Sequence, residues 1–420
     1  MDRKARFFCG CAAAVVLTAF GDVTVTTDRA DARYKTGETV TFIVTPDAEA
    51  PAMPLKAVMS LDNGKQLSSE TIQSDKGGQF TGKLDAPGVL TLRVTGVVGG
   101  KKLNVAAGAA VDADKIVPGA PAPADFNEYW AGELAKAEQV PLDPKVTKLD
   151  KFSNDKYTSY EVSLAVPDGR IHGFLCVPNK PGRLPALIGI EPSGSGRAVP
   201  VVNQFGNRMV VFWINIHDFS PSLGTPERNK AYKAVNTPVM YYLSNRSDRD
   251  KYYFHRVLLG LSRAVDYLAS RPEVDPGKIG VWGVSQGGGL ALMVTSLNPK
   301  VKAVCAHVPA LCDQHAFKQG RSPGWPRLVD PKDEATSVCA GYYDTVNFCR
   351  NIKVPTWIIA RLGDDTCPPG SVCAAFNVIP AAQKDLVLEP SKGHSGASDA
   401  FGNSLSRMRV TINRMPSGVK

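Results

Sequence analysis

The feature that most constrains this chain is one short segment in its second half, Ile279-Gly280-Val281-Trp282-Gly283-Val284-Ser285-Gln286-Gly287-Gly288-Gly289-Leu290. An apolar run typical of a buried strand ends in Gly-x-Ser-x-Gly, and a stretch typical of a helix follows at once. A serine on such a strained strand-to-helix turn needs small neighbours, and its hydroxyl then projects above the sheet. We therefore predict that Ser285 is a nucleophile. The alternative is a glycine-rich turn whose serine only caps a helix.

Residues 1–21 are typical of a secretory signal peptide. Three basic residues (Arg3, Lys4 and Arg6) precede an apolar stretch over 7–20, which is too short to span a bilayer. Ala19-Phe20-Gly21 resembles a cleavage site, so we expect a mature chain that starts near Asp22 and is exported, either periplasmic or secreted. No later segment is long and apolar enough to predict a membrane span.

Charge and cysteine content exclude several kinds of partner. The net charge is +9, but the basic residues are scattered, so no nucleic-acid partner is expected. Two of the nine cysteines lie in the leader, and the other seven show neither a disulfide framework nor cysteine–histidine metal spacing. We predict that these seven are buried thiols and that the chain has no metal site.

With 420 residues the chain is too long for one common core, and two or three domains are expected. Residues 22–113 alternate polar and apolar side chains in several short runs separated by turns such as Asp62-Asn63-Gly64, which predicts an immunoglobulin-like β-sandwich. Residues 114–124 contain Pro118-Gly119-Ala120-Pro121-Ala122-Pro123 and are predicted to form a stiff linker.

Residues 125–420 alternate predicted strands and helices, which indicates an α/β domain with a mostly parallel sheet and helices on both faces. The predicted strands are Tyr160–Val166, Ile171–Val177, Ala186–Ile190, Val210–Ile214, Ile279–Trp282, Ala303–Val308, Thr356–Ala360 and Asp385–Glu389. The predicted helices include Phe254–Ser270, Gly288–Leu297, Ser371–Val378 and Asp399–Met415.

A serine hydroxyl needs a base to take its proton. On this strand-to-helix arrangement the chain order is serine, acid, histidine, and the histidines after Ser285 are His307, His315 and His394. His307 lies in a predicted strand and is expected to be a hydrogen-bonded structural residue, and His315 leaves little room for an intervening acid. We therefore predict that His394, in a loop of small residues, is the base.

The acid is expected on the loop after the preceding strand, where Asp364 and Asp365 are adjacent, and spacing alone leaves both open. An oxyanion formed on a substrate would need two backbone N–H donors. Gln286, the residue after the nucleophile, would supply one. The second would come from Ser193 or Gly194 in the glycine-rich loop after the strand Ala186–Ile190, because Pro192 has no N–H.

Several motifs over residues 120–415 together resemble the acetyl xylan esterase and cephalosporin-C deacetylase family of α/β-hydrolases. They are Ser285-Gln286-Gly287-Gly288-Gly289-Leu290-Ala291-Leu292, Val308-Pro309-Ala310-Leu311-Cys312, Tyr342-Tyr343-Asp344-Thr345-Val346-Asn347-Phe348, Asp364-Asp365-Thr366-Cys367-Pro368-Pro369, Ala374-Ala375-Phe376-Asn377 and Gly393-His394.

This resemblance implies an α/β-hydrolase fold and a serine esterase that removes acetyl groups from xylan or xylo-oligosaccharides without a cofactor. It places the acid on Asp364, three residues before Cys367-Pro368-Pro369. It also places Ser193 where the family carries a tyrosine in the oxyanion loop. Family members often form hexamers without a leading β-domain, so a homo-oligomer is the assembly that the resemblance implies.

Two other functions fit parts of the sequence. A serine peptidase of the prolyl-oligopeptidase type shares the fold and the order of the three residues, although residues 22–113 are too few for its propeller. A non-catalytic carbohydrate-binding protein on a hydrolase scaffold is the second. Specificity is expected in the irregular loops His217–Asn236 and Cys312–Pro331, the latter with Trp325. Because no candidate catalytic residue lies in 22–113, we expect its removal to leave small-ester turnover nearly intact.

Overall fold

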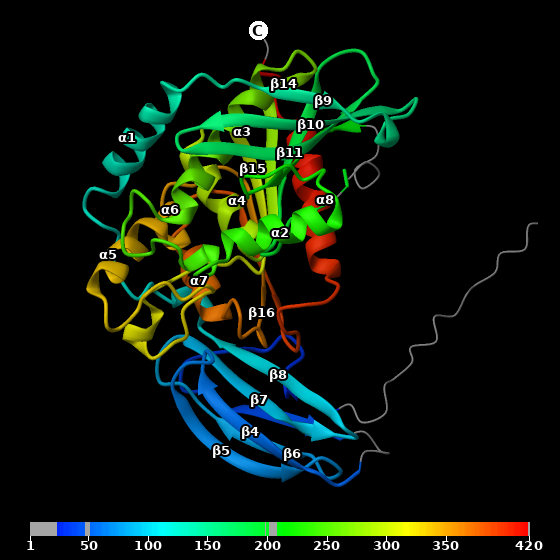
Figure 1. Ribbon diagram of the computed structural model, residues 1–420. Helices are drawn as coiled ribbons and strands as arrows, with labels where there is room; N and C mark the ends of the chain where they lie inside the picture. Colours follow the sequence, from blue (N-terminus) through cyan, green and yellow to red (C-terminus); the bar gives the residue numbers. More distant parts are fainter. Residues whose placement is uncertain (1–22, 47–50, 198, 201–207, 419–420) are drawn as a thin grey trace, which may run out of the picture.

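The computed structural model describes residues 23–46, 51–197, 199–200 and 208–418. The predicted signal peptide lies outside these residues. In the described part of the chain, no helix is long and apolar enough to cross a membrane. Figure 1 shows two bodies, a smaller one made of strands and a larger one in which helices surround a sheet.

The smaller body, here called the β region (residues 23–113), consists of two facing sheets. One sheet has the order β1-β3-β6 and the other β2-β8-β7-β4-β5. Their inner faces share a core that includes Phe42, Leu55 and Leu92. The strands are β1 (Thr24–Thr27), β2 (Arg33–Tyr34), β3 (Val40–Thr45), β4 (Pro54–Leu61), β5 (Gln66–Gln73), β6 (Gly78–Gly82), β7 (Gly88–Val98) and β8 (Lys101–Val111). Its immunoglobulin-like class remains a prediction.

The larger body contains a nine-stranded sheet in the order β17-β16-β15-β14-β12-β13-β11-β10-β9. Strands β12 to β17 run parallel to one another, and β11, β10 and β9 add an antiparallel edge. The strands are β9 (Lys145–Lys148), β10 (Tyr157–Val166), β11 (Gly169–Pro178), β12 (Leu184–Ile190), β13 (Val210–Asn215), β14 (Val274–Val284), β15 (Val301–His307), β16 (Thr356–Arg361) and β17 (Lys384–Glu389). The prediction of a mostly parallel sheet is confirmed.

Helices cover both faces of this sheet. On one face α8 packs Leu405, Met408 and Ile412 against strand residues that include Trp282 and Trp357. On the other face α3 and α4 bury their apolar sides in the main core. The helices are α1 (Phe126–Glu138), α2 (Thr225–Val235), α3 (Tyr253–Ser270), α4 (Gln286–Leu297), α5 (Glu334–Tyr343), α6 (Thr345–Cys349), α7 (Pro369–Asn377) and α8 (Asp399–Arg414).

Two elements differ from the sequence-based expectation for physical reasons. The loop His217–Asn236, expected to be irregular, contains α2, which has no buried residue and therefore lacks the apolar stripe that identifies a helix. Strand β9 is exposed along its whole length and shows no alternation. The seven cysteines after residue 22 are free and buried, as predicted.

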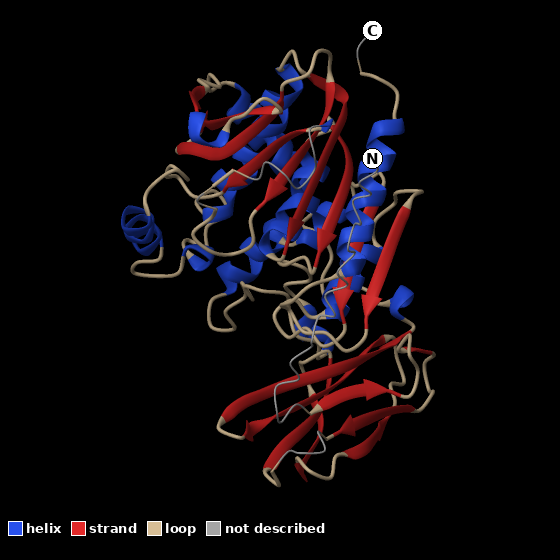
Figure 2. Cartoon of the chain, turned by 90° about the vertical axis from the view of Figure 1, so that its right-hand side faces the viewer, coloured by secondary structure: helices blue, strands red, loops and turns tan. Residues whose placement is uncertain are grey.

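The β region lies against the larger body near β16 (Figure 1), and Figure 2 shows the all-strand body below the larger one in a view turned by 90°. Buried side chains of both bodies meet there in a shared apolar cluster that includes Ala110 from β8, Leu362 from the loop after β16 and Ala374 from α7. Residues predicted to form a separate module and a linker are therefore packed directly on the loops that follow the central strands.

Candidate active site

Ser285 lies at the turn between β14 and α4, with φ 56° and ψ −120°. The glycines around it are required by close contacts between backbones. A Cβ on Gly283 would lie 2.2 Å from the carbonyl oxygen of Gly287, and a Cβ on Gly287 would lie 2.1 Å from that of Ile190. The Gly-x-Ser-x-Gly pattern thus marks a turn whose backbone is in close contact with the neighbouring strand β12.

Three predicted residues from distant parts of the chain meet above this turn. The Nε2 atom of His394 lies 2.9 Å from Ser285 Oγ, and its Nδ1 atom lies 2.7 Å from Asp364 Oδ2. Asp364 is fully buried, whereas 22% of the His394 side chain is exposed. A carboxylate on Nδ1 favours the tautomer whose Nε2 lone pair faces the serine, so this arrangement can accept the serine proton.

Of the two adjacent carboxylates only Asp364 faces the imidazole. Its other oxygen, Oδ1, accepts hydrogen bonds from the backbone N–H groups of Thr366 (2.8 Å) and Cys367 (2.9 Å), which fix the carboxylate plane. Asp365 instead forms an ion pair of 3.2 Å with Arg93 of the β region, and its side chain is 44% exposed. The structure thus separates two residues that spacing alone could not.

The loop that carries His394 is held by Arg361, which sequence reasoning did not single out. Its guanidinium donates hydrogen bonds to the backbone carbonyls of five consecutive residues, Gly393, His394, Ser395, Gly396 and Ala397. Its Nε atom lies 2.9 Å from Glu389 Oε2. Burial raises the pKa of Glu389, but hydrogen bonds from Arg361, Lys392 and Ser398 outweigh it, so the net pKa is lowered.

Two of the three residues predicted to supply oxyanion donors, Gln286 and Ser193, lie next to the serine. Gln286 is the first residue of α4, where a backbone N–H has no partner within the helix. Ser193 lines the same cavity as Ser285. The carbonyl of Gly194 accepts a hydrogen bond from His217 Nε2 at 2.8 Å, which ties the loop to the residues after β13. Burial lowers the pKa of His217 to about 4, so this histidine is neutral at pH 7.

Tyr241, which the sequence analysis did not identify, connects the loop of Ser193 to the start of α4. Its hydroxyl donates to Gln286 Oε1 at 2.5 Å and lies 2.9 Å from Ser193 Oγ. The ring is fully buried, and burial raises the pKa of its hydroxyl, which therefore remains a proton donor. No sequence signal marks this residue, because it follows the loop around α2 and belongs to no motif.

A cavity of about 620 Å³ opens above Ser285 and His394. Trp325, from a loop predicted to set specificity, and Phe401, from α8, contribute its aromatic walls. His307 also lines it and lies in its predicted strand, but the expected hydrogen bond is not found at Nε2 among the described residues. The residue is buried at the end of β15, and its ring stacks on Phe401.

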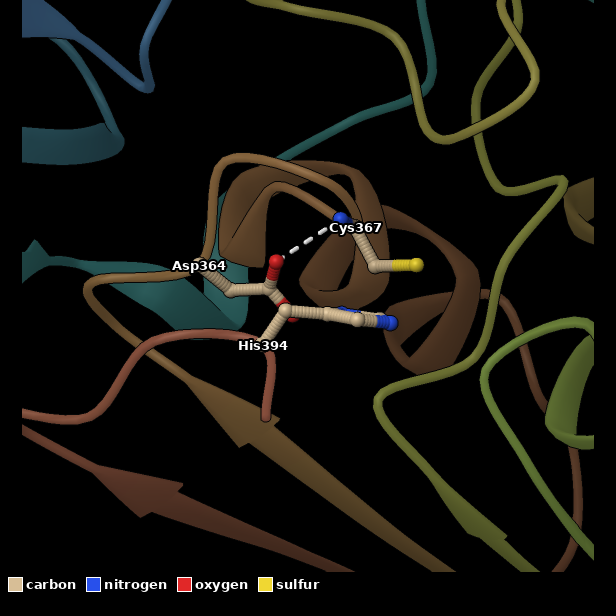
Figure 3. A group of neighbouring side chains, drawn as sticks. All are labelled: Asp364, Cys367 and His394. Carbon is tan, nitrogen blue, oxygen red and sulfur yellow. Dashed lines mark hydrogen bonds and ion pairs between the residues drawn. The ribbon is translucent and has the colours of Figure 1, made fainter. Parts of the chain in front are cut away.

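Asp364, Cys367 and His394 bring one carboxylate oxygen, one sulfur and one imidazole nitrogen within 4.8 Å of one another, a set that could hold a metal ion. Figure 3 shows these side chains together, with the bond from the Cys367 backbone N–H to Asp364 dashed. Burial raises the pKa of the Cys367 thiol well above its usual value, which disfavours the thiolate that a metal prefers. The carboxylate and imidazole are also engaged with each other.

Comparisons with known proteins show the family of this chain. Residues 113–407 match the family described as acetyl xylan esterase (AXE1). Acetyl esterase Axe7A from Xylanibacter ruminicola is 30% identical over 392 residues, which cover 89% of this chain and 86% of that protein. This match is too long to be confined to residues 114–420 and therefore includes part of the β region.

Two solved structures resemble most of this chain. Acetyl xylan esterase from Paenibacillus sp. R4 has a TM-score of 0.59 at 26% identity and covers 72% of this chain and 98% of its own. Acetyl xylan esterase 1 from Thermoanaerobacterium sp. JW/SL YS485 has a TM-score of 0.61 at 24% identity, over 71% of this chain and 97% of its own. With the family match over most of the chain, these findings make the protein a carboxylic ester hydrolase, and it belongs to the acetyl xylan esterase family.

Proposed function

We propose that this protein removes acetyl groups from acetylated xylan or xylo-oligosaccharides through an acyl-enzyme on Ser285. The observation that carries the proposal is the hydrogen-bonded series Asp364–His394–Ser285 at the floor of an open cavity, in a chain of the acetyl xylan esterase family. Export to the periplasm or the medium, where such a polymer is met, remains part of the proposal.

In the first step Ser285 Oγ attacks the acetyl carbonyl carbon while His394 Nε2 takes the hydroxyl proton. The backbone N–H groups of Gln286 and of Ser193 or Gly194 would stabilise the oxyanion. Asp364 holds the imidazole and stabilises its cation. Collapse of the tetrahedral intermediate breaks the bond from the carbonyl carbon to the sugar oxygen, which receives the proton from His394.

In the second step water attacks the acetyl-serine, and His394 Nε2 takes the water proton. The intermediate then releases acetate, and Ser285 Oγ regains its proton from His394. Every proton is transferred by one imidazole, so this reaction requires no cofactor. Trp325 and Phe401 line the cavity above Ser285 and would therefore contact the sugar. Their rings offer a large apolar surface beside the few polar groups of the site.

The test is the release of acetate from acetylated xylan and from a small aryl acetate. If the wild-type protein cleaves neither, the proposal fails. A fluorophosphonate probe should label Ser285, and labelling should disappear in Ser285→Ala. Hydrolysis of dipeptide anilides with aryl acetates left intact would favour a peptidase instead. A folded protein that is neither labelled nor active would favour a carbohydrate-binding role.

A further inference from the structure

The loop that carries the candidate acid is fastened to the β region by two side chains. Asn63 Nδ2 donates a hydrogen bond to the backbone carbonyl of Asp364 at 3.0 Å. Arg93 Nη2 donates to the carbonyl of the preceding residue, Gly363, also at 3.0 Å. Both donors come from residues more than 250 positions earlier in the chain. No sequence motif connects them to the candidate active site.

Arg93 is itself held in place from several directions. Its Nη1 donates to Asn104 Oδ1 at 2.6 Å, and its Nη2 donates to Asn63 Oδ1 at 3.1 Å. The ion pair with Asp365 adds a charged contact to the residue that follows Asp364. Only 19% of the Arg93 side chain is exposed. The guanidinium thus joins two β-region residues, Asn63 and Asn104, to the two residues that flank Asp364.

The backbones leave no room for the loop to shift toward the β region. A Cβ on Gly363 would lie 2.7 Å from the carbonyl oxygen of Ala106 in β8, and a Cβ on Gly108 would lie 2.3 Å from that of Leu362. The turn with Asn63 is also enclosed, since a Cβ on Gly64 would lie 2.3 Å from the Gly320 oxygen. Asn63 has φ 57°, a conformation that asparagine and glycine adopt more readily than other residues.

We propose that Arg93 and Asn63 are positioning residues for Asp364, so that the β region is part of the active-site scaffold. Catalytic groups must be held within about 0.5 Å of their productive positions. Asp364 receives two bonds from its own loop, to Oδ1, while Asn63 and Arg93 fix the loop backbone against an independent body. This inference rests on the proposed function, and it reverses the expectation that residues 22–113 are dispensable for small-ester turnover.

The test uses the full chain with Arg93→Ala, Asn63→Gly and the double variant. Asn63→Gly keeps a residue that tolerates φ 57° and removes only the side chain. Each single variant should lower kcat for an aryl acetate about tenfold, the ratio expected for one lost hydrogen bond to a buried group. KM should stay within about twofold, because neither residue lines the cavity above Ser285. The double variant should lose less than the product, since the two side chains are bonded to each other.

A spectroscopic readout separates positioning from loss of folding. The downfield proton resonance of the His394 Nδ1–H, present when Asp364 accepts its bond, should weaken or move in both variants. The matched control is Arg29→Ala, which breaks an exposed ion pair with Glu38 elsewhere in the β region. It should leave kcat and the resonance unchanged. Arg93→Lys keeps one donor and should recover part of the lost kcat.

The inference is overturned if folded Arg93→Ala and Asn63→Gly retain kcat within twofold of wild type. It is also overturned if the loss disappears when rates are normalised to the folded fraction measured by circular dichroism. Failure of the proposed function would look different, because the wild-type protein would then cleave no ester and Ser285 would not react with the fluorophosphonate.

Discussion

Arg361 donates a hydrogen bond from Nη1 to the backbone carbonyl of His394 at 3.2 Å, although Arg361 is the last residue of β16 and His394 lies on the loop after β17. The side chain is fully buried and its charge is balanced by Glu389 on β17. A buried guanidinium with five carbonyl acceptors defines the shape of a loop rich in glycine and serine, which has little apolar surface of its own.

Arg361→Lys should therefore reduce both activity and stability. A lysine retains the charge opposite Glu389 but cannot reach five carbonyls, and each buried group left without its partner costs about 1–3 kcal/mol. We expect kcat for an aryl acetate to fall at least about tenfold and the unfolding midpoint to fall by about 5 °C or more. Arg407→Lys, in an exposed pair with Asp385, is the control and should change neither. Equal behaviour of the two variants would contradict this role.

Asp364→Asn should lower kcat by roughly 10⁴-fold, the scale known for removing the acid of a serine triad. Asp365→Asn should cost less than about tenfold, because its carboxylate is partly exposed and faces Arg93 rather than His394. Both substitutions are nearly isosteric, so steady-state kinetics on purified, folded variants compare the two positions directly. A larger loss at Asp365 would overturn the assignment.

Much of the larger body could be predicted because its signals are local. The strands around Ser285 are continuous apolar runs. The close backbone contacts at Gly283 and Gly287 require glycine, so they appear in the sequence as the Gly-x-Ser-x-Gly motif. Neighbouring residues in the sequence do not decide between Asp364 and Asp365. The choice depends on which carboxylate faces a loop thirty residues later, and only the family resemblance favoured Asp364 before the structure placed it 2.7 Å from His394.

The contacts of the β region could not be predicted at all. Arg93 lies in an alternating strand where a polar residue is expected to face solvent, and Asn63 lies in a turn that favours asparagine for its backbone conformation alone. Strand alternation alone accounts for Arg93, and turn preference alone accounts for Asn63. Nothing in the sequence therefore indicates that either residue also contacts the acid loop. Tyr241 is a similar case, since its hydroxyl finds Gln286 and Ser193 only in the folded chain.

Tyr241→Phe should lower kcat about tenfold, because Gln286 Oε1 loses its donor in a fully buried position and Ser193 loses its link to α4. The benzene ring keeps its packing, so the unfolding midpoint should fall by only a few degrees. Tyr242→Phe, at the neighbouring tyrosine, is the matched control and should stay within twofold of wild type. Measurement of kcat and KM for an aryl acetate distinguishes the two, and unchanged kcat in Tyr241→Phe would exclude a role in shaping the oxyanion loop.

Asp62 is fully buried where the β region meets α7. Its Oδ1 accepts a hydrogen bond from Gly370 N–H at 3.0 Å, and its Oδ2 has no partner among the described residues. Burial raises the pKa of this carboxyl to about 7, and Arg321 opposes that effect in part. The protonated form therefore contributes stability that is fully present below the pKa of the unfolded chain, near 4, and is lost as the pH rises through about 7.

Asp62→Asn removes this dependence, since an amide cannot ionise and its oxygen can still accept from Gly370. Asparagine also tolerates the φ of 49° at this position. In urea unfolding, the free energy of unfolding of the variant relative to wild type should rise between pH 5 and pH 8, by an amount on the order of a few kcal/mol. Asp85→Asn, at an exposed carboxylate of the β region, should show no such trend. If the difference between Asp62→Asn and wild type is the same at both pH values, the buried carboxyl does not titrate as inferred.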